Sequence, residues 1–262
     1  MRGDSQLSTP RSSVKKWVKA IAYPILLRAF DAALYVGKNN QAYWLHYGFP
    51  EQRLFFSPHC IETKRFAEGA TAEARDALRN RLGIAPTSFV VLFAGKLLPF
   101  KRPLDIVAAL AKLRKAKVDC RMMVAGSGPL EAELTALAAE LQVPLDLLGF
   151  QNQSQMPAAY AAADILVLPS DGRETWGLVA NEALASGKPI IVSDAVGCAP
   201  DLAADESCGQ VFTMGDHDAL AKALSVAMNS KIDLASIARI SDKHSMQCAI
   251  DGIHAAIIAS VK

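Results

Sequence analysis

From Phe89 onward the chain alternates short apolar runs with longer segments of helical periodicity. This alternation is typical of repeated βαβ units built around a parallel sheet. The run Val90–Ala94 is apolar at every position, so helices should cover both faces of its sheet. The sequence therefore predicts an α/β domain with a Rossmann-like, doubly wound parallel sheet, whose ligand lies at the carboxyl ends of the strands. Strands are predicted at Val90–Ala94, Arg121–Ala125, Leu145–Leu148, Ile165–Leu168, Ile190–Ser193 and Gln210–Phe212, and helices at Pro103–Lys115, Pro129–Leu141, Gln155–Ala163, Leu178–Ser186 and His217–Met228.

The segment before Phe89 has a different pattern with fewer elements. Met1–Ser13 is polar and expected to be loose, and Val14–Ala32 is predicted to be a helix. Two short strands, Ala33–Val36 and Leu54–Ser57, are too few to close a sheet of their own. We therefore predict a partial N-terminal unit and linker over residues 1–60, a ligand-binding domain over 61–230 and a helical segment over 231–262.

The last element is expected to be a single helix over Asp242–Val261. Cys248, Ile253, Ala256 and Ile257 would lie near one of its faces.

Composition excludes several classes of protein. The 262 residues include 28 Lys and Arg against 26 Asp and Glu, a net charge of +2, and 51% are hydrophobic. A disordered chain would have less apolar content. A protein that binds nucleic acid mainly through electrostatic attraction would be more basic, so no nucleic-acid partner is expected. The five cysteines form no C-x-x-C pair, which argues against a disulfide framework or a zinc cluster. We expect reduced thiols in the cytoplasm, and neither a metal nor a cofactor.

One segment near the N-terminus is apolar enough to raise the question of membrane contact. Lys15, Lys16 and Lys19 precede the apolar run Ala20–Leu27. Arg28 soon interrupts this run, well short of the roughly 20 apolar residues that a span requires. We favour an amphipathic helix packed on the protein. A signal peptide and a peripheral contact with a membrane surface are the alternatives.

Two loops after predicted strands have compositions suited to a phosphate. In the first, Gly95 allows close approach of the backbone, and Lys96 and Lys101 offer ammonium groups near the start of a helix. Two cations beside free N–H groups fit a diphosphate, although ordinary solvated charges would explain them equally well. The second loop, Gly126–Pro129, is a tight turn that would form a wall of the site.

The third loop contains two acids eight residues apart, Glu174 and Glu182. On one straight helix this step covers about 12 Å, so the two carboxylates should serve separate points on an extended ligand. Glu174 could accept hydrogen bonds from sugar hydroxyls, and Glu182 could hold a ribose diol, unless it is a buried structural carboxylate. Between them, the N–H groups of Gly177, Leu178 and Val179 would point at a phosphate.

The stretch Glu174–Glu182 resembles the E-x7-E motif of the retaining glycosyltransferases of family 4, which have the GT-B fold. Gly95–Lys101 resembles the G-[RK]-x-x-x-x-K loop of this family, and Val124–Pro129 resembles its V-x-G-x-G-P turn. The motifs occur in the same order as in the family over about residues 92–224, which makes the resemblance specific. Further matching positions are Leu148–Phe150, Tyr160, Ala163–Asp164, Pro169–Ser170, Gly187–Ile191 and Val196–Gly197.

The resemblance implies a domain that binds a nucleotide-diphospho-sugar donor for transfer, with retention, to a glycan or lipid-linked acceptor. Lys96 and Lys101 would neutralise the leaving diphosphate, and Glu174 would orient the sugar. The other implied donor contacts are Gly95 in the diphosphate loop, Phe150 and Gln151 at the base, Trp176 in the sugar pocket, Gly177, Leu178 and Val179 at the phosphate, and Glu182 at the ribose. Catalysis would then rest on positioning and on stabilising the developing charge.

Two features depart from the family pattern. The motif reads Glu174-Thr175-Trp176-Gly177 where many members have E-G-F-G, and Asp201 stands near a usual glutamate. Only about 60 residues precede the linker-like Pro58–Glu62, whereas the acceptor domain of a GT-B enzyme is as large as its donor domain. The chain could therefore be an enzyme that is complete only with a separate acceptor-domain subunit, or a module that only binds a nucleotide sugar. A dinucleotide-dependent oxidoreductase is disfavoured because no G-x-G-x-x-G follows the first strand.

Overall fold

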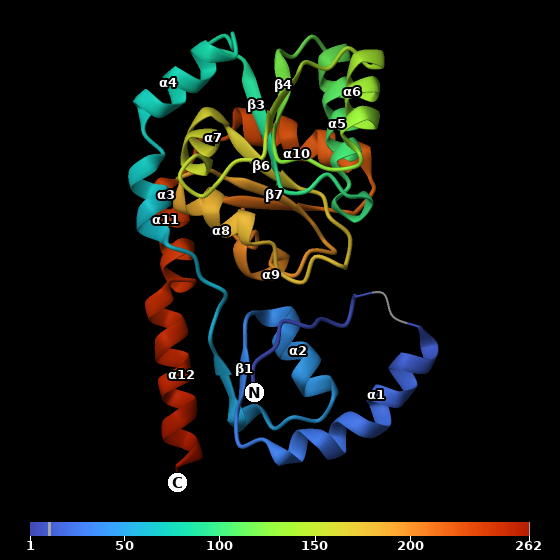
Figure 1. The fold of residues 1–262 in the computed structure, drawn as a ribbon, viewed down its shortest axis with the longest axis vertical. Coiled ribbons are helices and arrows are strands. Elements are labelled where there is room, and N and C mark those ends of the chain that lie inside the picture. Colours follow the sequence, from blue (N-terminus) through green and yellow to red (C-terminus); the bar gives the residue numbers. More distant parts are fainter. Residues whose placement is uncertain (10–11, 262) are drawn as a thin grey trace.

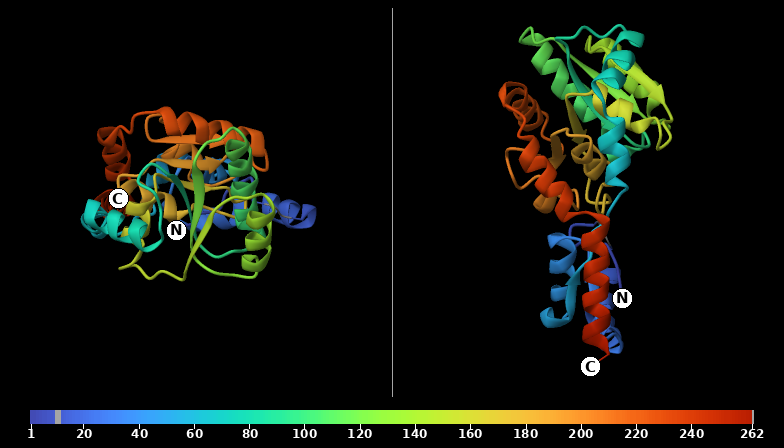
Figure 2. Two further views of the ribbon diagram at one scale, coloured as in Figure 1. Left: turned by 90° about the horizontal axis from the view of Figure 1, so that it is seen from above. Right: turned by 90° about the vertical axis from the view of Figure 1, so that its left-hand side faces the viewer.

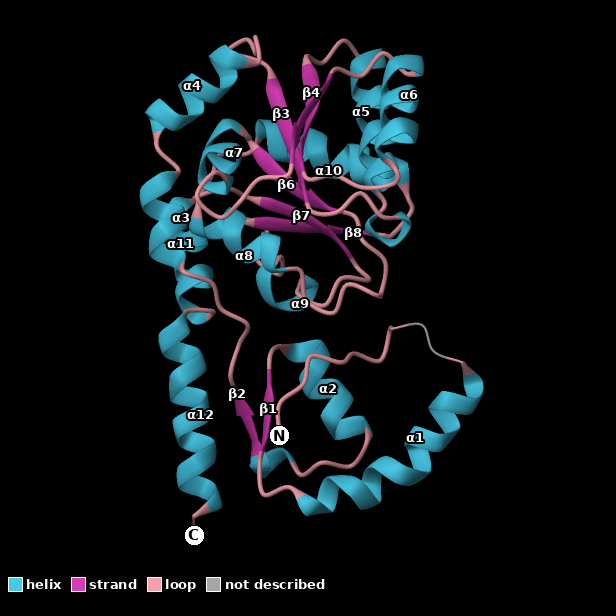
Figure 3. Ribbon diagram, in the orientation of Figure 1, coloured by secondary structure: helices cyan, strands magenta, loops and turns pink. Residues whose placement is uncertain are grey.

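The computed structural model describes residues 1–9 and 12–261, with the side chain of Lys16 left out. The molecule is elongated and consists of a large α/β domain at one end and a smaller unit at the other (Figure 1). Figure 3 shows the main sheet in the larger domain and a separate group of short strands in the smaller unit. None of the helices in these ranges is long and apolar enough to cross a membrane.

The main sheet has six parallel strands in the order β5-β4-β3-β6-β7-β8. The order reverses between β3 and β6, as in a doubly wound sheet. This confirms the predicted fold class, and every predicted strand of this domain is present. The strands are β3 (Phe89–Ala94), β4 (Cys120–Ala125), β5 (Leu145–Gly149), β6 (Ile165–Leu168), β7 (Ile190–Ser193) and β8 (Gly209–Phe212).

Helices cover both faces of this sheet because its central strands are apolar on both sides. In β3, Leu92 belongs to one core cluster and Phe93 to the other, and both are fully buried. The Leu92 face packs against α4 (Ala72–Arg81), α7 (Met156–Ala162), α8 (Leu178–Ala185) and α11 (Leu234–Lys243). The Phe93 face packs against α5 (Pro103–Lys115), α6 (Glu131–Glu140) and α10 (His217–Asn229). The remaining elements are α3 (Thr63–Gly69), the 3-10 turn η3 (Pro99–Lys101) and α9 (Ala199–Leu202), and α3 and α4 lie where the sequence analysis assigned no element.

The smaller unit is built around two parallel strands, β1 (Ala33–Tyr35) and β2 (Leu54–Phe56). Its core is aromatic and includes the buried side chains of Tyr43, Trp44 and Tyr47. The strand predictions are confirmed. The predicted helix over Val14–Ala32 ends earlier, as α1, and continues as a 3-10 turn. The other elements are α1 (Ser13–Leu26), η1 (Leu27–Ala29), α2 (Lys38–His46) and η2 (Glu51–Arg53).

The expectation that Met1–Ser13 is loose was wrong for its first residues. Arg2 forms an isolated parallel bridge with Leu34 of β1. Gln6 is only 1% exposed. The physical reason is that the edge of β1 offers backbone partners, and carbonyl groups of the large domain accept hydrogen bonds from Gln6.

The expected single helix over Asp242–Val261 was also wrong, because two helices meet there. Asp242 belongs to α11, and α12 (Met246–Ser260) starts after Ser245, whose hydroxyl caps it by accepting from the N–H of Cys248. The buried residues of α12 are Ala249 and Ala256, so of the four residues predicted near one face only Ala256 is buried. Small residues suit this position because α12 runs close along β2 of the smaller unit (Figure 2).

Candidate functional site

A large cavity lies at the carboxyl ends of β3, β4 and β5, beside the point where the strand order reverses. Its volume is about 700 Å³. This is the edge of a doubly wound sheet at which ligands bind. The lining residues are Ala94, Gly95, Lys96, Ala125, Gly126, Ser127, Gly128, Phe150, Gln151, Asn152, Gln153, Met156, Val179 and Glu182.

Two glycines of the Gly126–Pro129 turn allow it to touch the loop after β3. A Cβ atom on Gly126 would lie 1.9 Å from the carbonyl oxygen of Gly95, and one on Gly128 would lie 2.6 Å from that of Leu97. Gly126 also has a φ of 153°, which other residues rarely adopt. The turn therefore forms a wall of the cavity, and any side chain there would force the two loops apart.

Of the two predicted lysines, only Lys96 lines the cavity. Lys101 forms a salt bridge with Glu174 instead, and both side chains are about 15% exposed (16% and 15%). Ser170 adds a hydrogen bond of 3.3 Å from its hydroxyl to Oε2 of Glu174. The structure thus pairs two residues that the sequence analysis assigned to the sugar and the diphosphate separately.

Glu182 lines the cavity from within α8 and has a hydrogen-bond donor behind it. The hydroxyl of Tyr160 donates to its Oε2 at 2.7 Å. Burial raises the pKa of the Glu182 carboxyl, and the hydrogen bond from Tyr160 partly opposes this rise. Within the described side chains of residues 1–9 and 12–261, Glu182 forms no salt bridge with a cation.

Helix α8 starts beside the cavity without a side-chain cap. Gly177 takes a φ of 100° just before it, and a Cβ atom there would lie 2.5 Å from Leu168. Backbone N–H groups in the first turn of a helix lack partners within the helix and can bind an anion. Val179 lines the cavity, whereas the side chain of Leu178 is 42% exposed and is not part of the lining.

An aromatic ring forms the outer part of the cavity. Phe150 is 78% exposed, which is unusual for a large apolar side chain and leaves its ring open for stacking. The side-chain amide of Gln151 donates at 2.7 Å to the carbonyl oxygen of Leu148 and so holds the turn after β5.

Trp176 does not contribute its ring to this cavity. It is 3% exposed and packs between His59 and His244, with ring centroids 5.8 Å and 5.7 Å away. Its indole N–H donates to Oδ1 of Asn181 at 2.8 Å. The ring therefore belongs to the interior between the two units.

The structure brings Gly95, Lys96, Phe150, Gln151, Val179 and Glu182 into one cavity. Sequence reasoning missed Tyr160 and Ser170 as partners of the two glutamates, although both were noted in the matching pattern. It also missed Asn152, Gln153 and Met156 of the lining. The Tyr160–Glu182 contact joins two helices and has no signal in the local pattern, whereas Ser170 lies only four residues before Glu174.

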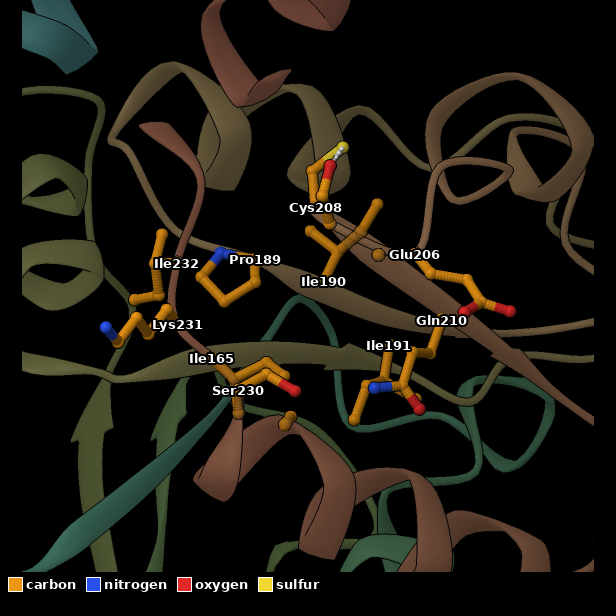
Figure 4. Close-up of a pocket in the computed structure, with 13 residues that line it drawn as sticks. Ile165, Pro189, Ile190, Ile191, Glu206, Cys208, Gln210, Ser230, Lys231 and Ile232 are labelled. Atoms are coloured by element: carbon orange, nitrogen blue, oxygen red, sulfur yellow. Dashed lines mark hydrogen bonds between the residues drawn. The ribbon is translucent and has the colours of Figure 1, made fainter. Parts of the chain in front are cut away.

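A second cavity lies at the opposite, amino ends of β6 and β7 (Figure 4). Figure 4 shows a mixed wall, in which apolar residues such as Ile165 and Ile190 stand beside polar ones such as Glu206 and Lys231. Its volume of about 30 Å³ has room for about one water molecule. Within residues 1–9 and 12–261, no group of three His, Cys, Asp or Glu side chains is placed to hold a metal ion.

The fold and the cavity place the chain in the class of Rossmann-like α/β proteins with a ligand site at the switch point of the sheet. The sequence model of the family described as "Glycosyl transferases group 1" matches residues 74–244. The chain therefore belongs to this glycosyltransferase family.

Curated relatives of the chain carry glycosyltransferase names. It is 33% identical over 170 residues to a D-inositol 3-phosphate glycosyltransferase of Segniliparus rotundus, a match that covers 63% of the chain and 36% of the relative. It is 30% identical over 193 residues to a GDP-mannose-dependent monoacylated alpha-(1-6)-phosphatidylinositol monomannoside mannosyltransferase of Corynebacterium glutamicum, covering 71% of the chain and 50% of the relative. The chain thus spans half or less of the length of these relatives.

Solved structures share the fold at lower identity. Alr3699/HepE of Anabaena in complex with UDP aligns with a TM-score of 0.82 at 19% identity, over 98% of this chain and 71% of that one. A glycosyltransferase of Rickettsia africae aligns with a TM-score of 0.76 at 17% identity, over 97% of this chain and 69% of that one. These alignments include both the Rossmann-like domain and the smaller unit.

Proposed function

We propose that the chain provides the donor site of a retaining glycosyltransferase, which transfers a hexosyl-type sugar from a nucleotide-diphospho-sugar to a glycan or lipid-linked acceptor. The observation that carries this proposal is the cavity at the switch point, which combines Lys96, Glu182 and the exposed ring of Phe150. Family membership supports the same reaction class. The HepE structure holds UDP, and the Corynebacterium relative is named as GDP-mannose-dependent, which supports a nucleotide-sugar donor for this chain.

Each part of a donor finds a chemically suitable group in this arrangement. The ring of Phe150 offers a stacking surface for the base, and the carboxylate of Glu182 can accept hydrogen bonds from two ribose hydroxyls. Lys96, with the backbone N–H groups at the start of α8, suits the diphosphate. The Glu174–Lys101 pair is then left for the sugar and the leaving diphosphate.

The proposed mechanism depends on positioning and on charge stabilisation. Lys96 and Lys101 would neutralise the negative charge that develops on the diphosphate as the bond to the sugar breaks. Glu174 would hold the sugar so that the acceptor attacks from the face that the leaving group departs, which retains the anomeric configuration. No metal or cofactor takes part in this proposal.

A second candidate is a donor-binding module that transfers sugar only with a separate acceptor-domain subunit. The observation that favours it is the smaller unit, whose sheet has two strands in the described ranges. Binding without transfer by the isolated chain, and transfer after a partner is added, would support this candidate over a self-sufficient enzyme.

Calorimetry with UDP, GDP, ADP and their glucose or mannose derivatives tests the donor site. We expect one of these bases to bind. Glu182→Ala and Lys101→Ala should each weaken binding of that nucleotide diphosphate by roughly 1–3 kcal/mol, the usual cost of losing a charge-assisted contact.

Glu133→Ala and Lys115→Ala, at exposed positions outside the cavity, are the matched controls. Failure of the whole nucleotide panel to bind, or unchanged affinity in both site variants, would contradict the proposed site.

We also propose that α1 makes a peripheral contact with the cytoplasmic face of an anionic membrane. Val14, Trp17, Ile21 and Ile25 recur at helical spacing, and each is 52–71% exposed. Lys15 is exposed beside them, and α1 contains no acidic residue. An outward apolar face with an aromatic ring and basic neighbours suits a lipid interface.

Sedimentation with vesicles tests this contact. The chain should pellet with phosphatidylglycerol-containing vesicles and less with pure phosphatidylcholine. The double substitution Trp17→Ser and Ile21→Ser should release it, whereas Val211→Ser and Val226→Ser, at exposed apolar positions elsewhere, should not. Equal pelleting of both double variants would refute the assignment to α1.

A further inference from the structure

The N-terminal segment reaches across to the loop that carries Glu174. The amide nitrogen of Gln6 lies 3.2 Å from the carbonyl oxygen of Glu174 and 3.3 Å from those of Gly172 and Ala195. Gln6 is 1% exposed. A buried amide group that donates to carbonyl oxygens holds their backbone in place, because the alternative is to bury polar groups without partners.

A second contact from the same segment holds the other side of Glu174. Oδ2 of Asp4 accepts a hydrogen bond of 2.9 Å from the hydroxyl of Thr175. The loop between β6 and α8 has no regular secondary structure over residues 169–177, so its conformation depends on such contacts. The carbonyl oxygen of Glu174 also accepts from the N–H of Gly197 at 3.0 Å.

The segment is in turn fixed to the smaller unit. The side-chain amide of Asn40 donates to the carbonyl oxygen of Ser5 at 2.7 Å, and Arg2 bridges to β1. Gln6 therefore connects the smaller unit to the backbone of Glu174. None of its described hydrogen-bond partners belongs to the lining of the 700 Å³ cavity.

We infer that Gln6 is a positioning residue for Glu174, and that it controls recognition of the sugar of the donor without affecting the nucleotide. This inference rests on the proposed function. Its physical basis is the separation of the two sets of contacts: Gln6 and Asp4 hold the loop of Glu174, whereas Lys96, Phe150 and Glu182 line the cavity. Lys96, Phe150 and Glu182 therefore stay in place when the Gln6 contact is lost. Lys101, the salt-bridge partner of Glu174, is held by its own 3-10 turn, in which its backbone N–H donates to the carbonyl oxygen of Leu98 at 3.0 Å.

The test compares a nucleoside diphosphate with its sugar derivative in calorimetry, using the base that the wild-type chain binds. Gln6→Met keeps the length of the side chain but removes the amide donor. It should lower affinity for the nucleotide sugar by about five- to tenfold, the size of a lost hydrogen bond, and change affinity for the nucleoside diphosphate less than twofold. Thr175→Val removes the Asp4 contact and should act in the same direction.

Lys38→Met is the matched control, because Lys38 joins the two units through the carbonyl oxygen of Pro200 at 2.9 Å and does not contact the Glu174 loop. It should leave both affinities unchanged. Equal losses for the diphosphate and the sugar derivative in Gln6→Met, or no loss for either, would overturn the inference while the donor site stands. If the wild-type chain binds none of the nucleotides, the proposed function and this inference fall together.

Discussion

At the scale of single residues, the two glutamates of the site differ in the group that stabilises their negative charge. Glu174 is paired with Lys101, whereas Glu182 is supported by the neutral hydroxyl of Tyr160. A carboxylate that must be ionised to hold a ribose diol depends on this support, because burial favours its protonated form. The pKa of Tyr160 is itself raised by burial and by the nearby carboxyl, so its hydroxyl stays protonated and can donate.

Tyr160→Phe tests this dependence. The pKa of Glu182 is already raised by burial, and loss of the hydrogen bond should raise it further. A larger fraction of Glu182 is then protonated at a given acidic pH, so nucleotide affinity should begin to fall at a higher pH than in the wild-type chain. Calorimetric titrations between about pH 5 and 8 measure this shift. Tyr35→Phe, in the smaller unit, is the control, and identical pH profiles for all three proteins would contradict the role of Tyr160.

At the scale of elements, α12 connects the large domain to the smaller unit and packs against the strands of that unit. It leaves the large domain after α11 and packs along β2, where the hydroxyl of Ser57 donates to the carbonyl oxygen of Ala249 at 3.0 Å. Gly252 marks the closest approach, because a Cβ atom there would lie 1.8 Å from the carbonyl oxygen of Phe56. Contact at this distance requires a glycine in the middle of the helix.

Gly252→Ala sets helix propensity against packing. Propensity alone would favour alanine by about 1 kcal/mol, but the added methyl group has no room beside Phe56, so we expect a lower melting temperature. Overpacking of this kind typically costs about 1–3 kcal/mol. The comparison is Ala255→Gly at an exposed position of the same helix, which should lose stability by propensity alone. A raised melting temperature in Gly252→Ala would show that α12 does not pack this closely.

At the scale of the whole molecule, Asp201 joins the two units. Its carboxylate, on α9, accepts from the backbone N–H of Lys38 at 3.0 Å and 3.2 Å and so caps α2 of the smaller unit. Burial raises the pKa of Asp201 to about 6. The native state therefore binds a proton that the unfolded chain has lost between the ordinary pKa of 3.8 and about 6, and this group makes stability fall as pH rises through that range.

Asp201→Asn should remove this dependence, because an amide oxygen can still accept from Lys38 but does not ionise. Relative to the wild-type chain, the variant should gain stability of the order of 2 kcal/mol between about pH 4 and pH 7. Melting temperatures over this range provide the measurement. Asp205→Asn is a control with the opposite pH dependence. Hydrogen bonds from Ser207 and then Arg239 lower the pKa of Asp205, so its contribution to stability is lost as pH falls. Parallel pH profiles for Asp201→Asn and the wild-type chain would contradict the assignment.

The sequence by itself determined the large domain and the loops of its site. Continuous apolar strands such as Val90–Ala94 and the helical periods between them are local signals, and parallel strands bring Gly95, Lys96, Phe150 and Glu182 to one edge of the sheet. The helices α3 and α4 were not predicted, although α4 has local signals in its N-cap Thr71 and in Arg79 and Arg81 of its last turn.

Only the tertiary structure decided the partners of the side chains. Lys101 and Glu174 are 73 residues apart in the chain, and Gln6 and Glu174 are 168 apart. Nothing in their spacing specifies these contacts. The burial of Trp176 likewise follows from how the two units pack. Periodicity records which face of an element is apolar, whereas the choice of partner depends on the three-dimensional arrangement of surfaces that the sequence pattern leaves open.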